Sequence, residues 1–123
     1  MVGSALISLG IWELKAAIDR PRPGEGLIGV QGSSYPSGHA AHSVFYLWLA
    51  LTIVLRLRPG MARATAVVTA GLALTVLIGL SRVYLDVHYL SDVNGGWALG
   101  VACFSLCALV GLVISQLRQN SRR

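Results

Sequence analysis

Residues 93–117 read VNGGWALGVACFSLCALVGLVISQL, and none of these twenty-five residues carries a charge. As a helix this stretch would rise about 37 Å, more than the roughly 30 Å of a bilayer's hydrocarbon core. Residues 64–81 form a second uncharged stretch of eighteen residues, and residues 40–55 form a third of sixteen. The third is of borderline length, and a buried helix of a soluble protein would also explain it. Three such stretches in so short a chain predict three membrane-spanning helices.

The composition of the whole chain supports this interpretation. Charged residues make up 12% of the 123 residues and hydrophobic residues 54%, so too few polar side chains remain to cover a soluble globule. The same composition excludes a disordered chain, and it argues against a nucleic-acid partner despite a formal net charge of +5. We therefore predict an all-α fold, a polytopic membrane helix bundle that residues 1–123 form as a single domain.

A fourth helix is expected at the N-terminus. Residues 1–12 are apolar, helical spacing continues to Ile18, and Pro21 ends a helix that at about 27 Å barely spans a bilayer. Prolines and glycines mark residues 20–38 as a loop and Arg58-Pro59-Gly60 as a tight turn. The predicted helices are about residues 2–19, 39–57, 62–82 and 91–117, and residues 83–91 form the last connection.

Four helices place their connections alternately on the two sides of the membrane. The 56–63 connection shares one side with the C-terminal tail. That side carries no acidic residue and six arginines: Arg56, Arg58, Arg63, Arg118, Arg122 and Arg123. The 20–38 and 83–91 loops share the other side with all five acidic residues. Because basic residues concentrate on the cytoplasmic side, we expect an integral protein of the bacterial plasma membrane whose 20–38 and 83–91 loops are periplasmic.

The outer side also collects residues that could carry chemistry. His88 and Asp92 are four residues apart, so on a helix the carboxylate lies beside the imidazole and leaves its other nitrogen free as a base or nucleophile. The alternative is that Asp92 only caps the helix that follows. Ser37 and Gly38 stand where a loop enters a helix, a position whose free N–H groups bind anions. Ser37 could equally be only the N-cap of that helix.

Three cations are expected at the same membrane depth: Lys15, Arg22 and Arg82. Each alone would be explained as a side chain that anchors a helix at the membrane interface. Together they supply hydrogen-bond donors for a multiply charged oxyanion. With His39, His88 and a carboxylate beside them, a phosphoryl group is the natural target, since its transfer needs charge stabilisation, a nucleophile and an acid.

Three ordered motifs resemble the signatures of a known family. Lys15 to Pro23 matches K-x6-R-P, Pro36 to His39 matches P-S-G-H, and Ser81 to Asp92 matches S-R-x5-H-x3-D. In this order the motifs resemble the type-2 phosphatidic acid phosphatase superfamily, which also includes the vanadium haloperoxidases. Asp86 departs from the pattern, because many bacterial members have a small residue at that position.

The resemblance implies a phosphohydrolase that uses no metal and no other cofactor. In such an enzyme His88 would attack phosphorus, Asp92 would orient its ring, and His39 would protonate the leaving oxygen. The residues that the resemblance implies for binding the phosphoryl oxygens are Lys15, Arg22, Ser37, Gly38 and Arg82. The implied substrate is a phosphorylated lipid, such as phosphatidic acid, an isoprenyl diphosphate or a similar amphiphile.

Two other functions stay open on the sequence. A vanadate-dependent haloperoxidase would share the oxyanion site, although that branch of the superfamily is soluble and this chain is strongly apolar. A catalytically silent membrane segment that only binds a lipid phosphate is the second. The silent segment is favoured because membrane members of the superfamily usually have six helices, whereas this chain has room for four. We therefore expect one of two cases. Either the chain lacks the first two helices of the family, or it completes its helix bundle with a partner, and a homo-oligomer is one form that this partnership could take.

Overall fold

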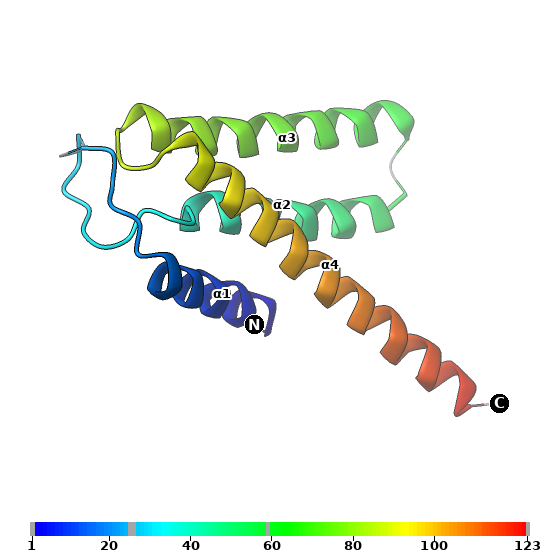
Figure 1. Ribbon diagram of the computed structural model, residues 1–123. Helices are drawn as coiled ribbons and strands as arrows, with labels where there is room; N and C mark the ends of the chain where they lie inside the picture. Colours follow the sequence, from blue (N-terminus) through cyan, green and yellow to red (C-terminus); the bar gives the residue numbers. More distant parts are fainter. Residues whose placement is uncertain (1, 25–26, 59, 123) are drawn as a thin grey trace.

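The computed structural model describes residues 2–24, 27–58 and 60–122, and over these residues it is helical with connecting loops (Figure 1). The helices are α1 (Val2–Ile18), α2 (Gly38–Arg56), α3 (Met61–Tyr84) and α4 (Leu90–Asn120). The last three are long and apolar enough to cross a membrane, as the uncharged stretches predicted. A membrane span for α1 stays a prediction. Residues 25–26 of the predicted loop, Pro59 of the predicted turn and Arg123 lie outside the described residues.

Two helices continue beyond the ends that the sequence predicted. α3 reaches Tyr84 instead of residue 82, and α4 reaches Asn120 instead of residue 117. In α4 the added residues include Arg118 and Gln119, and both residue types have high helix propensity, so the end of the uncharged stretch does not end the helix. α1 ends as Pro21 requires: Asp19 takes a φ of 40°, and its N–H donates to the Lys15 carbonyl at 3.0 Å.

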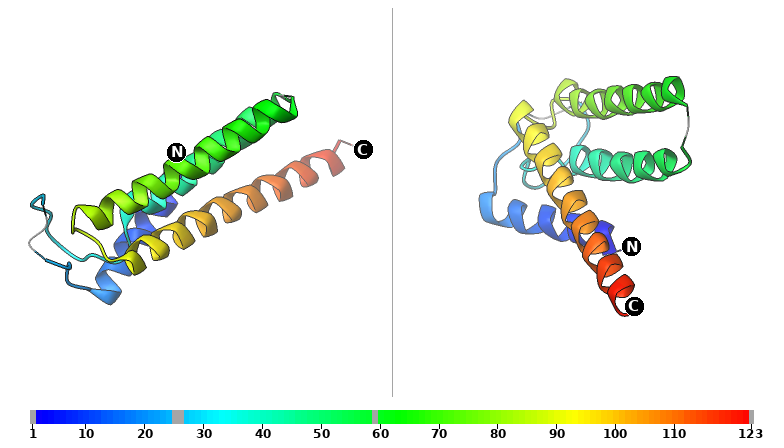
Figure 2. Two further views of the ribbon diagram at one scale, coloured as in Figure 1. Left: turned by 90° about the horizontal axis from the view of Figure 1, so that it is seen from above. Right: turned by 90° about the vertical axis from the view of Figure 1, so that its right-hand side faces the viewer.

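The α2–α4 crossing is the most extensive helix contact in the described chain, and it depends on two glycines. Gly96 lies against the Ser37 carbonyl and the Ala40 methyl group, and Gly100 lies against the Ala41 carbonyl and the Val44 side chain. These two glycines, four residues apart on α4, therefore let the backbones of α2 and α4 approach closely within one chain. α4 crosses α2 obliquely, so its C-terminal half diverges from the other helices (Figures 1 and 2).

A small core joins α1 to this crossing. Ile7 from α1, Ala41 and Phe45 from α2, and Cys103 from α4 are buried together. Phe45 also makes an edge-to-face contact with the Phe104 ring, at a centroid distance of 6.2 Å. These contacts hold α1 against the α2–α4 pair and direct its C-terminal end toward the connecting loops.

Two connections from distant parts of the chain meet at one end of the bundle, as Figure 1 shows. The loop between α1 and α2 is tied to the α3–α4 connection by the Leu27 N–H, which donates to the Leu85 carbonyl at 3.0 Å. The N-termini of α2 and α4 are joined there by the Ser37 N–H, which donates to the Asp92 carbonyl at 2.9 Å. All three sequence motifs therefore come to the same end of the molecule.

Candidate active site

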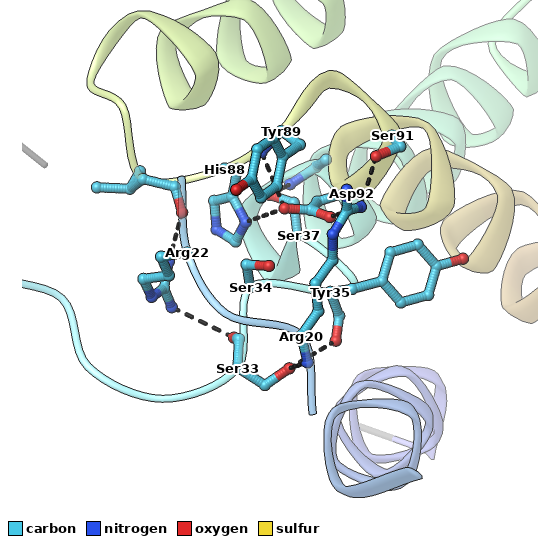
Figure 3. Close-up of polar contacts among 12 residues, drawn as sticks. Arg20, Arg22, Ser33, Ser34, Tyr35, Ser37, His88, Tyr89, Ser91 and Asp92 are labelled. Carbon is cyan, nitrogen blue, oxygen red and sulfur yellow. Dashed lines mark hydrogen bonds and ion pairs between the residues drawn. The ribbon is translucent and has the colours of Figure 1, made fainter. Parts of the chain in front are cut away.

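Asp92 lies at the centre of this end of the bundle, with a side chain that is 0% exposed (Figure 3). It stands in the first turn of α4, where its Oδ2 accepts a hydrogen bond from the Tyr89 N–H at 2.9 Å. The same Oδ2 lies 3.5 Å from Nδ1 of His88. The two interpretations of Asp92 are therefore compatible, because one carboxylate caps the helix and faces the imidazole at once.

His88 lies just before α4, and its side chain is only 6% exposed. Its Nδ1 has no hydrogen-bond partner among the described residues, and 3.5 Å to Asp92 exceeds an ordinary hydrogen bond. Catalytic hydrogen bonds are often this long before a substrate binds. Burial lowers the pKa of His88 and the Arg22 guanidinium lowers it further, while Asp92 opposes the shift. The imidazole is therefore neutral at neutral pH, the form in which a histidine can act as a nucleophile.

Lys15 and Arg22 lie close enough to act electrostatically on the His88 ring. Backbone carbonyls of the loop between α1 and α2 hold both side chains. The Lys15 ammonium donates to the Ser33 carbonyl, and Nε of Arg22 donates to the Gly32 carbonyl at 3.1 Å. A further guanidinium nitrogen of Arg22 donates to the Val87 carbonyl at 2.7 Å. Two cations are thus fixed beside a neutral imidazole, an arrangement suited to an anion with several oxygens.

The P-S-G-H motif opens α2, as the sequence predicted. Ser37 is fully buried and is the N-cap of α2, because its Oγ accepts from the Ala40 N–H at 3.5 Å. His39 follows in the first turn and is exposed. The capping alternative for Ser37 therefore holds, and its backbone also anchors α2 to α4 through Asp92.

His39 and Arg82 line a cavity of about 910 Å³ between α1, α2 and α3. Near the motif end its wall includes Gly38, His39, His42, Ser81 and Arg82, and the other polar residues that line it are Ser8, Ser43 and Tyr46. The apolar part includes Ile11, Leu47, Leu74 and Ile78. Nε of Arg82 donates to the Ser81 Oγ at 3.2 Å, which connects two residues of the third motif. A charged group at the polar end would thus have apolar side chains beyond it.

The predicted site residues form two neighbouring groups. Around the buried imidazole of His88 lie Lys15, Arg22 and Asp92. The other group, which lines the cavity, consists of Gly38, His39 and Arg82. Ser37 lies between the groups through its backbone bond to Asp92. Within the described ranges, no hydrogen bond or ion pair joins His39 or Arg82 directly to His88.

Sequence reasoning missed Arg20. This residue stands inside the K-x6-R-P motif, and one of its guanidinium nitrogens donates to Oδ1 of Asp92 at 2.8 Å. The repeated Arg-Pro pair at 20–23 was the available signal, but spacing along the chain does not show which residue the first arginine reaches. The structure also shows why a small residue suits position 86, since the φ of 55° at Asp86 lies in the left-handed region, where glycine is favoured and aspartate is tolerated.

The fold and the three converging motifs define a family. The chain belongs to the PAP2 superfamily, whose family model matches residues 1–114. This match confirms the resemblance drawn from the three motifs.

Two matches from Bacillus subtilis show which branch the chain resembles. Phosphatidylglycerophosphatase B of Bacillus subtilis (strain 168) is 34% identical over 110 residues, covering 87% of this chain and 54% of the relative. The crystal structure of the first transmembrane PAP2 type phosphatidylglycerolphosphate phosphatase from Bacillus subtilis matches with a TM-score of 0.81 at 30% identity. That match covers 92% of this chain and 57% of the other. The chain thus spans a little over half the length of these relatives, and it has the fold of an integral membrane protein.

Proposed function

We propose that this chain carries the active site of a membrane-embedded phosphatase that hydrolyses a lipid phosphate through a phosphohistidine intermediate. The observation that carries the proposal is the buried His88–Asp92 pair beside Lys15 and Arg22, at the end of the bundle where all three motifs meet. A nucleophile with a carboxylate partner and fixed cations is what phosphoryl transfer requires.

In the proposed reaction Nε2 of His88 attacks phosphorus, since Nδ1 faces Asp92. An N–P bond forms and the ester P–O bond breaks, while His39 gives a proton to the leaving oxygen. Water then attacks phosphorus, His39 accepts its proton, and the N–P bond breaks to release inorganic phosphate. Lys15, Arg22 and Arg82, with the Gly38 N–H and the Ser37 hydroxyl, stabilise the phosphoryl oxygens. An acid is needed because a lipid alkoxide leaves poorly unless it is protonated.

The substrate class follows from the cavity and from the relatives. The cavity places apolar side chains beyond His39 and Arg82, where an acyl or isoprenyl chain would lie while the phosphate occupies the polar end. Because both matches are named for phosphatidylglycerophosphate, a diacylglycerol phosphomonoester of that type is the first substrate to test. Phosphatidic acid and an isoprenyl diphosphate are the alternatives.

The periplasmic face is the proposed position of the site. The arginine-rich connection between α2 and α3 and the C-terminal end of α4 lie at the opposite end of the bundle from the motifs (Figure 1). Since arginine-rich connections stay in the cytoplasm, the motif end would face outward.

The decisive experiment measures phosphate release by the full chain in detergent micelles with EDTA present. We expect turnover of the lipid phosphate, complete loss in His88→Ala, and inhibition by orthovanadate, whose trigonal-bipyramidal form mimics the transition state. After a quench with substrate labelled on phosphorus, the label should be on the peptide that contains His88.

Several results would contradict this mechanism. They are a label on His39, or turnover that EDTA abolishes and a divalent cation restores. Saturable binding of the lipid without turnover would favour the silent binding segment. Bromide oxidation after addition of vanadate would favour the haloperoxidase.

A further inference from the structure

Arg20 is the cation in direct contact with the buried carboxylate. One of its guanidinium nitrogens donates to Oδ1 of Asp92 at 2.8 Å and to the Ser91 Oγ at 2.6 Å. The guanidinium carbon lies 4.3 Å from the centroid of the Tyr89 ring, a cation–π distance. Figure 3 shows that Arg20 and His88 reach Asp92 from different sides. Arg20 is therefore fixed by three groups at the start of α4: the Tyr89 ring, the Ser91 hydroxyl and the Asp92 carboxylate.

The backbone of Arg20 is anchored as firmly as its side chain. Its N–H donates to the Ser33 Oγ at 3.1 Å, and its carbonyl accepts from the Ser34 N–H at 2.8 Å. Both bonds cross the loop between α1 and α2. The loop thus presents the guanidinium to Asp92 from a defined backbone position, which lowers the entropic cost of holding a long side chain in one geometry.

The two oxygens of Asp92 have separate partners. Oδ1 accepts from Arg20, while Oδ2 accepts from the Tyr89 N–H and faces Nδ1 of His88. With both oxygens held, the carboxylate plane cannot rotate away from the imidazole. Burying a carboxylate is costly without a counter-charge, and within the described ranges Arg20 is the one basic partner of Asp92 at ion-pair distance apart from His88.

We infer that Arg20 is a positioning residue, which balances the charge of the Asp92 carboxylate and keeps it turned toward His88, and does not itself contact the phosphoryl group. This inference rests on the proposed function. It separates the two arginines of Arg20-Pro21-Arg22-Pro23: the first acts through the carboxylate, and the second lies beside the imidazole for the phosphate.

The kinetic test compares Arg20→Met and Arg20→Lys with the wild-type chain, and uses Arg118→Met as a control at the far end of α4. Arg20→Met should lower kcat by about 10- to 100-fold, the range typical of residues that orient a reacting group's partner, with little change in KM. Arg20→Lys should recover part of the loss because it keeps the charge. Arg118→Met should match the wild type.

The pH profile separates positioning from a merely structural role. The charged groups that face His88 are Lys15 from α1, Arg22 from the loop and Asp92 from α4, and the Arg20→Met substitution replaces none of them. Loss of a positive charge makes the first proton bind the His88–Asp92 pair more readily, whichever member takes it. The acid limb of kcat/KM should therefore move to higher pH in Arg20→Met and return toward the wild-type position in Arg20→Lys.

An NMR titration of the His88 ring in the full chain gives a readout that does not need turnover. The midpoint should move upward in Arg20→Met and stay in place in Arg118→Met. If the midpoint moves upward in Arg20→Met but the wild type shows no turnover, the proposed function fails. The coupling of Arg20 to the His88–Asp92 pair then still stands. Unchanged kcat, acid limb and midpoint in Arg20→Met would overturn the inference. Should Arg20→Met not fold, Arg20→Asn takes its place, and wild-type kcat together with an unshifted midpoint in a folded Arg20→Asn would overturn the inference.

Discussion

Replacement of Gly100 by alanine tests whether the α2–α4 crossing positions the site. A Cβ at residue 100 would lie 2.5 Å from the Ala41 carbonyl oxygen and 3.0 Å from the Val44 Cβ, whereas ordinary contacts begin at 3.4 Å. The first of these neighbours is backbone, so it cannot turn aside as a flexible side chain would. The two helices would have to separate by about 1 Å at this point.

The expected cost follows from this overlap. Overfilling a packed site typically destabilises a protein by about 1–3 kcal/mol, and the higher helix propensity of alanine returns up to about 1 kcal/mol. The net expectation for Gly100→Ala is a loss of about 0–2 kcal/mol in the free energy of unfolding, toward the upper end because the Ala41 carbonyl cannot move aside. Because the crossing also holds the Ser37–Asp92 bond, a shift of about 1 Å at the site could lower turnover by up to about 10²-fold.

The assay is thermal unfolding in detergent, with phosphate release measured on the same samples. Gly111→Ala is a matched control on the same helix, since a Cβ at residue 111 would meet nothing within 4 Å. This control should be neutral or more stable than the wild type, with unchanged activity. If Gly100→Ala unfolded at the same temperature as Gly111→Ala and kept full turnover, the close-approach argument would be wrong.

Three further predictions concern the chemistry and the topology. His39→Ala should lose about 10²–10⁴-fold in rate on a lipid phosphate and much less on an aryl phosphate, whose leaving oxide needs little protonation; equal losses on both substrates would remove His39 as the acid. The midpoint of the acid limb of kcat/KM should lie below about 6.5, the ordinary pKa of histidine, because burial and Arg22 lower the pKa of His88 and the neutral ring is the nucleophile. A midpoint above that pKa would contradict the assignment of His88. In intact cells, and in a background without native cysteines, an impermeant thiol reagent should label a cysteine at the exposed position 28 but not one at position 60. Labelling of position 60 alone would invert the topology.

The helical spans and part of the site could be predicted from sequence alone, because both depend on local patterns. An uncharged stretch such as residues 64–81 needs no partner to be long enough for a bilayer, and α3 covers it. The i, i+4 spacing of His88 and Asp92 predicts neighbours wherever the segment is helical or nearly so, and the two side chains do meet. The order of the three motifs was sufficient to predict the family that the family model confirms.

The contacts that complete the site depend on segments far apart in the sequence, so only the tertiary structure decided them. Arg20 and Asp92 are 72 positions apart, and nothing in their spacing tells which of the neighbouring arginines, Arg20 or Arg22, turns toward the carboxylate. That choice is made by the path of the loop between α1 and α2 and by the depth of the α2–α4 crossing at Gly96 and Gly100. Periodicity along a chain determines which side chains share a helix face, whereas contacts between helices depend on how closely the backbones pack.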